Sequence, residues 1–243
     1  IQNKITNFKP DFIIVVAYGL ILPDKILKVP KFASINGHAS LLPKWRGASP
    51  IQRSIESGDK ETGCTSMLME SGLDTGPILL QKKLDILNND DCIKIYEKLS
   101  KLTSECIIET IEKFSKGSIQ QIEQDPNKVS YAKKLKKEDG IIQWELKSLE
   151  IFNKLRAFKS FPGLFTFFNL NQLNIIDGSP VDKKHNEKPG TILSVKNSIL
   201  VACGNKTSFS IKYIKKTGKK ILSTNEFLNG FKLKEGDIFD NKK

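Results

Sequence analysis

Three polar side chains in the first half of the sequence have the types needed to move a proton and to stabilise a developing negative charge. Asn36 and His38 stand two residues apart in the stretch INGHAS, and Asp74 lies in the glycine-flanked stretch SGLDTG. Side chains two residues apart on an extended segment point to the same side, so Asn36 and His38 can face one cleft. The amide can donate to an oxyanion. The imidazole can accept a proton or, once charged, donate one, and Asp74 is the carboxylate best suited to orient it.

The sequence lacks the pattern of a covalent nucleophile. No G-x-S-x-G stretch is present, and no cysteine neighbours a histidine, so direct transfer between two bound substrates fits these residues better than a covalent intermediate. Simpler interpretations stay open. Asn36-Gly37 is also a strong turn pair, an aspartate between glycines can be solvated, and Trp45 and Arg46 can either clamp a substrate or pack structurally. We expect His185, in DKKHNEK, to be a surface-loop residue.

The elements that must position these residues indicate an α/β domain. The apolar run 11–19 predicts a buried parallel strand, and residues 33–36 predict a second strand that delivers Asn36 and His38 at its carboxyl end. Ligands bind beyond the carboxyl ends of strands in such sheets. The other expected elements are a helix over 49–63, two strands around the turn ESGLDTG, and an amphipathic helix over 90–116 that is capped by Asp90 or Asp91. The buried stripe expected on this last helix consists of Tyr96, Leu99, Thr103, Cys106, Thr110 and Phe114.

The second half of the chain has a different pattern and carries the positive charge. Residues 1–127 hold 16 of the 39 basic and 16 of the 27 acidic side chains, so the whole net charge of +12 falls on residues 128–243. This split favours a neutral chemical domain joined to a domain that binds a polyanion, although a lysine-rich proteome would also drift basic. We expect a helix over 148–159 and short strands at 191–195, 198–203 and 208–214, which together predict a small separate barrel.

Composition excludes several classes of protein. No run of about 18 apolar residues occurs, which excludes a membrane-spanning helix, and residues 1–10 lack the apolar core of a signal peptide. The four cysteines are widely spaced and form no C-x-x-C pair, so we expect neither disulfides nor a zinc site. A cytoplasmic location is the expectation that follows.

The stretch ASINGHASLLPKWRGASPIQRSIESGDKETG, followed by SGLDTGPIL, resembles the formyltransferase family that uses 10-formyl-tetrahydrofolate. Within that family, WRGASPIQ favours the branch that acts on methionyl initiator tRNA over the branches that act on sugar nucleotides or purine precursors. The stretches SYAKKLKKEDGIIQW, LRAFKSFPGLFTFF, PGTIL and TGKKILSTNEFLNG resemble the carboxyl-terminal domain of the same branch. The resemblance covers essentially the whole chain.

This resemblance implies a fold, a reaction and a set of site residues. The fold would be a Rossmann-like formyltransferase domain over 1–118, a basic linker over 119–140 and a small OB-like β-barrel over 141–243. The reaction would pass a formyl group from 10-formyl-tetrahydrofolate to the amino group of methionine on initiator tRNA, with no metal. The family's catalytic residues match Asn36, His38 and Asp74. Its folate-binding residues match Ser40, Leu41, Leu42, Pro43, Gly19, Leu20 and Leu22. The candidates for tRNA binding are Arg46, Lys133, Lys134, Lys136, Lys137, Lys215, Lys216, Lys219 and Lys220.

Two features depart from the family pattern. An apolar residue usually stands at the position of Gly37, and glycine there loosens the backbone by roughly 0.5–1 kcal/mol relative to alanine. Complete members also carry further strands, helices and a basic tRNA-contacting loop before the position of Ile1, so we expect this chain to be a fragment. Without those strands, the run 11–19 would form an exposed apolar edge, and we expect residues 1–116 to fold poorly by themselves.

Three functions compete on these observations. The lead interpretation is an enzyme, acting as a monomer with initiator tRNA and folate as partners and with no membrane association. The second is a relative that formylates an amino sugar nucleotide, against which the basic second half argues. The third is an inactive RNA-binding module, against which the joint presence of the Asn, His and Asp residues argues.

Overall fold

The computed structural model describes residues 2–240, which form two compact units. The first unit contains the chain up to residue 54 together with 59–134, and the second contains 55–58 together with the chain from 135 onward. This division differs from the predicted boundaries at 118 and 140, because residues 119–134 pack as part of the first unit. Over the described range, no helix is both long and apolar enough to cross a membrane.

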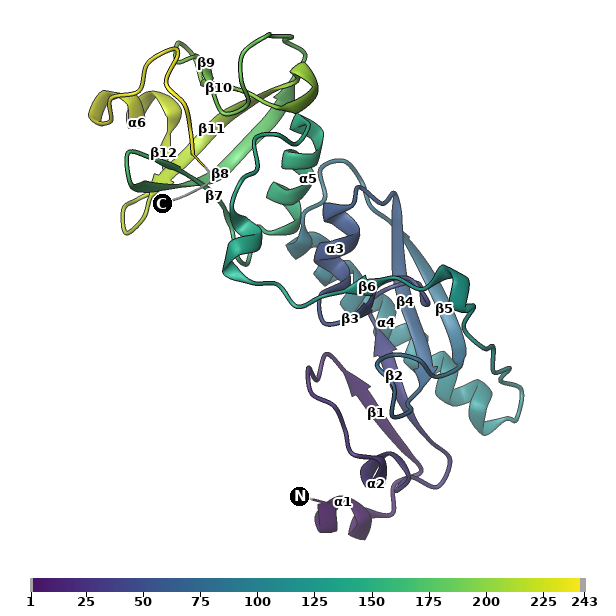
Figure 1. Cartoon of the computed structure of the whole chain (residues 1–243). Helices are drawn as coiled ribbons and strands as arrows, with labels where there is room; N and C mark the ends of the chain where they lie inside the picture. Colours follow the sequence, from purple (N-terminus) through teal and green to yellow (C-terminus); the bar gives the residue numbers. More distant parts are fainter. Residues whose placement is uncertain (1, 241–243) are drawn as a thin grey trace. The chain divides into compact units, whose positions relative to one another are not determined.

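The first unit is built around a four-stranded mixed sheet with the order β1–β2–β4–β5 (Figure 1). β1 runs parallel to β2, and the other neighbours are antiparallel. β3 and β6 form a separate parallel ladder. The elements are α1 (Gln2–Phe8), β1 (Phe12–Val16), α2 (Asp24–Leu27), β2 (Ala33–His38), β3 (Arg46–Gly47), α3 (Pro50–Glu56), β4 (Glu61–Leu68), β5 (Ile78–Asp85), α4 (Cys92–Ser115), the 3₁₀ turn η1 (Pro126–Lys128) and β6 (Tyr131–Ala132).

β1 forms one edge of this sheet. The prediction for residues 11–19 is confirmed in its parallel pairing but wrong in its burial, since Ile14 and Val16 are 38% and 50% exposed. The strand ends before Ala17, whose backbone turns to a left-handed φ of 52°. Within residues 2–240 no strand pairs with the outer edge of β1, so an apolar strand edge is exposed, as expected.

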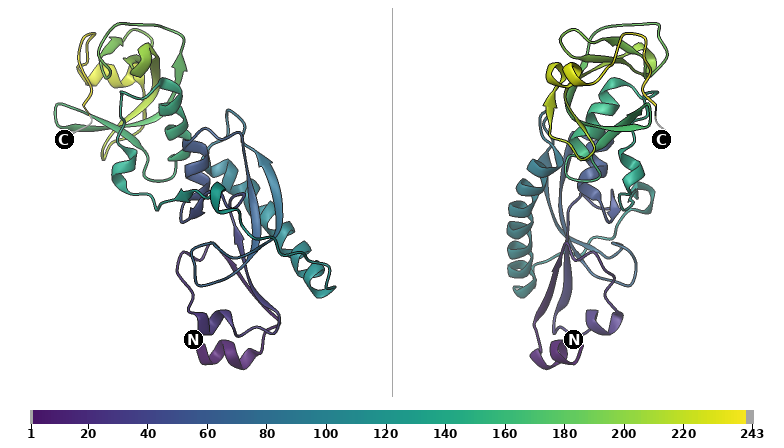
Figure 2. Two further views of the ribbon diagram at one scale, coloured as in Figure 1. Left: turned by 45° about the vertical axis from the view of Figure 1, so that its right-hand side comes forward. Right: turned by 90° about the vertical axis from the view of Figure 1, so that its left-hand side faces the viewer.

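α4 covers one face of the sheet (Figure 2). The predicted amphipathic helix is confirmed, and Asp91 caps it because its carboxylate accepts from the backbone N–H groups of Ile93 and Lys94. The stripe packs on the sheet against the buried residues Ala33, Ile35 and Leu79. Its buried members include Leu99, Thr103, Cys106 and Thr110, whereas Tyr96 is 61% exposed at the border of the stripe. The predicted helix over 49–63 is shorter than expected, because α3 ends before Gly58, which has a φ of 78°.

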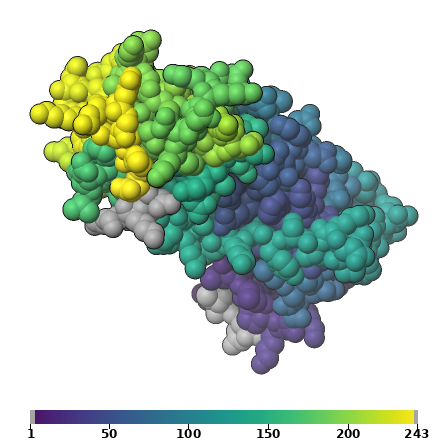
Figure 3. All heavy atoms as spheres, turned by 45° about the horizontal axis from the view of Figure 1, so that its top comes forward, coloured from purple at the N-terminus to yellow at the C-terminus, as the bar shows by residue number. Residues whose placement is uncertain are grey.

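The segment 117–134 follows α4 and runs over the surface of the first unit (Figure 3). The predicted linker is not a free connection there. Ile122 and Ile78 exchange two backbone hydrogen bonds, of 2.8 and 2.9 Å. β6 then pairs with β3, which places this segment beside the stretch that follows β2.

The second unit is a curled antiparallel sheet with the order β7–β8–β11–β10–β9, and β12 is added to β11. The three predicted strands at 191–214 are confirmed as β9, β10 and β11, and the predicted helix over 148–159 as α5. The elements are η2 (Lys137–Gly140), α5 (Ser148–Ala157), β7 (Leu164–Phe168), β8 (Asn171–Val181), β9 (Ile192–Ser194), β10 (Ile199–Ala202), η3 (Gly204–Lys206), β11 (Ser208–Lys216), β12 (Leu222–Ser223) and α6 (Thr224–Gly230).

The last described residues close this sheet. Asp240 bridges Phe167 of β7, and Ile238 bridges Thr191 beside β9, so one segment joins the two open edges. Two linked hydrogen bonds support the closure. Trp144 Nε1 donates to Thr166 Oγ1, and the Thr166 hydroxyl donates to the carbonyl of Asp240. The predicted small barrel is therefore an antiparallel sheet whose two edges are bridged by residues 238–240.

His185 is less exposed than its polar loop sequence suggested. It lies in the loop between β8 and β9 and is half-buried, and its Nε2 is 2.8 Å from the carbonyl oxygen of Thr207. Because a carbonyl only accepts, Nε2–H donates there and ties the loop to the barrel. The surface-loop prediction is therefore wrong for the side chain, although the loop itself is present.

Candidate active site

Asn36 and His38 stand at the carboxyl end of β2, next to the end of β1. The strand continues through Gly37, which pairs with Val16 of β1 and Ser66 of β4, so Asn36-Gly37 is not a turn. Asn36 and His38 are two residues apart on this strand and leave the same face of the sheet. The extended geometry predicted for the pair is therefore present, and the strand is two residues longer than expected.

Asp74 reaches this pair from the loop between β4 and β5. Its Oδ1 lies 3.3 Å from Asn36 Nδ2, which donates to it, and its Oδ2 lies 3.6 Å from His38 Nδ1. The backbone N–H of Gly47 donates to Oδ2 at 2.8 Å. Asp74 has a φ of 52°, a left-handed conformation that is uncommon for residues other than glycine, although aspartate adopts it more often than most. Folding thus brings together the three side chains that the sequence singled out.

The hydrogen bond at His38 Nε2 fixes how the imidazole can act. Nε2 lies 2.9 Å from the carbonyl oxygen of Trp45, which can only accept, so Nε2 carries a hydrogen and donates. In the neutral ring Nδ1 then holds the lone pair, and it faces Asp74. The His38 side chain is 7% exposed, and protonating Nδ1 would set an imidazolium against the carboxylate.

The stretch 45–48 contacts both the site and the segment that carries β6. Towards the site it offers the carbonyl of Trp45 and the N–H of Gly47. On its other side, the backbone N–H of Trp45 donates to the hydroxyl of Ser130, and the N–H of Arg46 donates to the carbonyl of Ser130. The N–H of Ala48 donates to the carbonyl of Ala132. Gly47 is required here, since its φ is 115° and a Cβ would lie 2.9 Å from the Ala132 carbonyl oxygen.

A cavity of about 820 Å³ opens beside the three polar side chains. It lies at the carboxyl ends of β1 and β2, where the sheet geometry predicted a ligand site. One wall is the apolar stretch 17–22, another is α4 through Leu99, Thr103 and Ile107, and Asn36, His38 and Asp74 also line it. The described residues contain no group of three or more His, Cys, Asp or Glu side chains that could hold a metal ion.

The structure separates the predicted folate-binding residues into two groups. Gly19, Leu20 and Leu22 line the cavity, together with Tyr18 and Ile21. Residues 40–43 do not line it: Ser40 and Leu42 are buried, and Leu42 packs against Met67 and Ile78. Ser40, Leu41, Leu42 and Pro43 therefore lie outside the lining of this cavity. Thr65 bonds both the carbonyl of Ser40 and the N–H of Leu42 and holds the stretch beside the sheet.

Gly37 does not loosen the site. A Cβ at this position would lie 2.8 Å from Thr103 Cγ2 and 3.2 Å from Val16 Cγ2, so α4 approaches the strand too closely for a side chain. Backbone pairing on both edges of β2 holds the residue in place. The expected loosening is therefore wrong, since packing and pairing restrict the glycine.

Trp45 and Arg46 pack structurally. The indole Nε1 of Trp45 donates to Asp59 at 2.8 Å. Arg46 is 8% exposed, and its Nε and Nη2 donate to Oε1 of Gln124 at 3.0 and 2.8 Å. The guanidinium is buried against Gln124, so it is not offered at the surface, where the expected contact with tRNA would be made. Gln124 itself has no sequence signal, since it lies in a stretch without periodicity.

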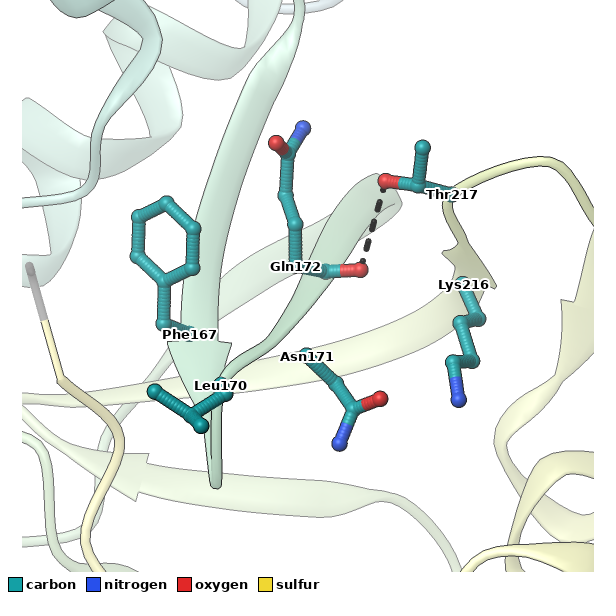
Figure 4. A pocket seen from close by; sticks show the side chains of 6 residues that line it. All are labelled: Phe167, Leu170, Asn171, Gln172, Lys216 and Thr217. Atoms are coloured by element: carbon teal, nitrogen blue, oxygen red, sulfur yellow. Dashed lines mark hydrogen bonds between the residues drawn. The ribbon is translucent and has the colours of Figure 1, made fainter. Parts of the chain in front are cut away.

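The predicted tRNA-binding lysines lie on the surface of the units. Lys133 and Lys134 end the first unit, and Lys136 and Lys137 begin the second. The second cluster spans the end of β11 and the turn after it. A small hollow of about 270 Å³ there is lined by Lys216, Thr217 and residues of β7, β8 and the turn between them (Figure 4). In that view Lys216 and Asn171 point to the same side of the turn. All eight lysines are exposed except Lys215, which is half-buried.

Fold and site together define a formyltransferase, and comparison with known proteins agrees. The formyl transferase family model matches residues 1–111, and the model of the formyl transferase C-terminal domain matches residues 134–232. The chain belongs to the formyl transferase family. It is similar to the methionyl-tRNA formyltransferase of Caldicellulosiruptor saccharolyticus, with 41% identity over 234 residues, which are 96% of this chain and 75% of that protein.

Solved structures support the same fold. HypX from Aquifex aeolicus, in complex with tetrahydrofolic acid, aligns with a TM-score of 0.68 and 19% identity, over 98% of this chain and 44% of that one. WlaRD, a sugar 3N-formyl transferase solved in the presence of dTDP and 5-N-formyl-THF, aligns with a TM-score of 0.67 and 20% identity, over 88% of this chain and 77% of that one. At these identities, the likeness concerns the fold alone.

Proposed function

We propose that this chain transfers a formyl group from 10-formyl-tetrahydrofolate to the amino group of methionine on initiator tRNA, for translation initiation. The observation that carries the proposal is the meeting of Asn36, His38 and Asp74 at one cavity. The similarity to a methionyl-tRNA formyltransferase over nearly the whole chain selects the substrates.

The geometry supports separate roles for the three side chains. Asn36 has two amide hydrogens, and one of them donates to Asp74, so the second is free to donate to the oxyanion that forms when the amine attacks the formyl carbon. His38 Nδ1 accepts the proton that the attacking amine loses. Asp74 stabilises the imidazolium that results. The C–N bond to the folate then breaks, and the imidazolium gives its proton to the leaving folate nitrogen, which restores the neutral ring.

The cavity suits a folate co-substrate. Its volume lies within the usual range for small-molecule sites, roughly 300–1,000 Å³. The apolar stretch 17–22 offers a wall for the pterin ring, and the polar groups converge at one end, where the formyl group would react. Holding both reactants at this junction would convert a bimolecular step into an effectively unimolecular one.

The charge of the second half supports tRNA as the other partner. Lysines on an exposed surface bind phosphates through counterion release, which depends little on nucleotide sequence. The clusters at 133–137 and 215–220 would hold the phosphates while the methionyl end enters the cavity. We propose a single chain acting on one tRNA.

A formylation assay tests this function. Wild-type protein, labelled 10-formyl-tetrahydrofolate and methionyl initiator tRNA should give formyl-methionyl-tRNA. His38→Ala should lower kcat by about 10²–10⁴-fold, the usual contribution of a general base. His185→Ala is the matched control, because His185 is the only other histidine and lies in the second unit. Unchanged transfer in His38→Ala would contradict the mechanism.

The competing functions give different results in the same assay. The fold shared with a sugar 3N-formyl transferase makes an amino sugar nucleotide the second acceptor to offer. Transfer to the sugar alone would replace the tRNA assignment. Tight tRNA binding with no transfer to either acceptor would identify an RNA-binding module.

A further inference from the structure

Gln124 joins the two backbone stretches that contact the site. It lies in the segment 117–134, and only 9% of the residue is exposed. Its Nε2 donates to the carbonyl oxygens of Asp74 and Gly76, both at 2.8 Å. Its Oε1 accepts from two nitrogens of Arg46. Both amide hydrogens and the amide oxygen are therefore engaged, which fixes the side chain in one orientation.

Two of the three partners of Gln124, Asp74 and Arg46, lead to the reacting groups. Asp74 is held through its own carbonyl, in a left-handed backbone conformation that costs free energy unless the surroundings hold it. Arg46 precedes Gly47, whose N–H bonds the Asp74 carboxylate, and follows Trp45, whose carbonyl bonds His38. Gln124 thus lies behind both contacts without reaching the cavity.

We propose that Gln124 is a positioning residue for formyl transfer: it fixes the backbone of Asp74 and so sets the separation between the Asp74 carboxylate and the His38 imidazole. This inference rests on the proposed function. Gln124 lies in the stretch that the sequence indicated only as a linker, and that stretch therefore contributes to the chemistry as well as connecting the two units.

Gln124→Glu separates positioning from folding. The substitution keeps the size of the side chain and sets a carboxylate against the buried Arg46 guanidinium, so an ion pair replaces the hydrogen bonds from the guanidinium to an amide oxygen. It also replaces both N–H donors with lone pairs that face two carbonyl oxygens. The loop of Asp74 must then shift, while the Arg46 side of the contact is retained.

The experiment measures kcat, KM and the imidazole signals of the variant. We expect kcat to fall by about 10–100-fold, the scale set by small misplacements of reacting groups, with KM for folate and tRNA within about twofold. Gln121→Glu is the matched control, because Gln121 is exposed three residues earlier in the same segment. Thermal unfolding of both variants shows whether each is folded. If Gln124→Glu fails to fold, Gln124→Met removes the donors without adding charge.

An NMR measurement is independent of turnover. The chain has two histidines, so the Cε1–H signals of His38 and His185 are easily assigned, and His185 serves as the internal reference. The His38 signal should move in Gln124→Glu and stay in Gln121→Glu. A folded Gln124 variant with wild-type kcat and an unmoved His38 signal would overturn the inference. Absent transfer in the wild type would instead count against the proposed function, and the signal of His38 would still decide the role of Gln124.

Discussion

The amide of Asn36 donates to the carboxylate of Asp74 at 3.3 Å, across 38 residues of sequence. This contact does two things. It commits one of the two amide hydrogens and so fixes the direction of the other, and it leaves Oδ2 of Asp74 to Gly47 and His38. The Asp74 carboxylate therefore contacts both Asn36, which would bind an oxyanion, and His38, which would accept a proton.

Removing that charge should lower turnover more than binding. Asp74→Asn keeps the shape of the side chain, but it no longer stabilises an imidazolium at His38. We expect kcat to fall by about 10²-fold or more with little change in KM, since the lost interaction acts after the substrates are bound. Steady-state assays check this, with Asp85→Asn on the exposed end of β5 as the control for loss of charge. Equal losses in the two variants would contradict the assignment.

Adding one carbon at Gly37 should destabilise the first unit. In Gly37→Ala the new methyl group would meet Thr103 Cγ2 at 2.8 Å, and overpacking of this kind costs about 1–3 kcal/mol. Thr103→Ser removes the opposing methyl group, so the double variant should recover part of the loss. Free energies of unfolding for the four proteins of this cycle measure the coupling. Additive effects would mean that the two groups do not meet.

Stability should fall at acid pH through Asp90. Burial by itself would raise the pKa of Asp90, but the hydrogen bonds from Lys98 and from the N–H of Leu87 hold the pKa below its ordinary value. Because the pKa of Asp90 is lower in the folded protein than its ordinary value of 3.8, the ionised carboxylate adds to the free energy of unfolding at any pH above 3.8. This contribution is lost as the pH falls through the pKa of Asp90 in the folded protein. Urea unfolding from pH 7 downward should show this loss in the wild type and a flatter profile in Asp90→Asn and in Lys98→Met. A profile of Asp90→Asn as steep as that of the wild type would exclude the contribution.

Thr166→Val should weaken the closure of the barrel. Valine matches threonine in shape but leaves the buried Trp144 indole N–H and the Asp240 carbonyl without this partner. An unsatisfied buried polar group costs about 1–3 kcal/mol. Denaturant unfolding of the second unit measures the loss, and Thr217→Val on the exposed turn after β11 is the control. Equal stability of the two variants would argue against a stabilising role of the hydrogen bonds that link Trp144, Thr166 and Asp240.

The lysine clusters should set the salt dependence of tRNA binding. Replacing Lys216, Lys219 and Lys220 together by glutamine should lower the slope of log affinity against log salt by about 0.7–0.9 for each lysine that contacts a phosphate. Titration of tRNA at several salt concentrations gives the slope. Lys101→Gln, on the exposed side of α4, is the control. A slope that is the same in the triple variant and the control would remove this cluster from the interface.

The sequence predicted those parts of the fold whose pattern is local. α4 has a regular apolar stripe and a capping aspartate, and the strands around the Asp74 loop are short apolar runs between turn residues, so both were identified. β7 and β8 were not separated, because FTFFNLNQLNII has no turn signal stronger than Asn-Leu-Asn. Their turn instead uses left-handed backbone at Asn169 and Leu170.

Chemistry and family resemblance predicted the three side chains of the site but not what holds them. The type and spacing of Asn36 and His38 are visible in the sequence. The burial of Ser40 and Leu42 is not, because it depends on Thr65 and Gln81, which reach the stretch from β4 and β5. The role of Gln124 also comes from tertiary contacts alone, with partners 48 to 78 residues away.

The stretch 45–48 meets His38 and Asp74 with main-chain atoms rather than side chains. The carbonyl of Trp45 and the N–H of Gly47 belong to consecutive peptide units, so the two anchors are joined through the backbone of Arg46 alone. The contacts of this stretch with His38 and with the Asp74 carboxylate are thus made by the main chain, and they can persist through sequence drift that would erase a contact made by side chains.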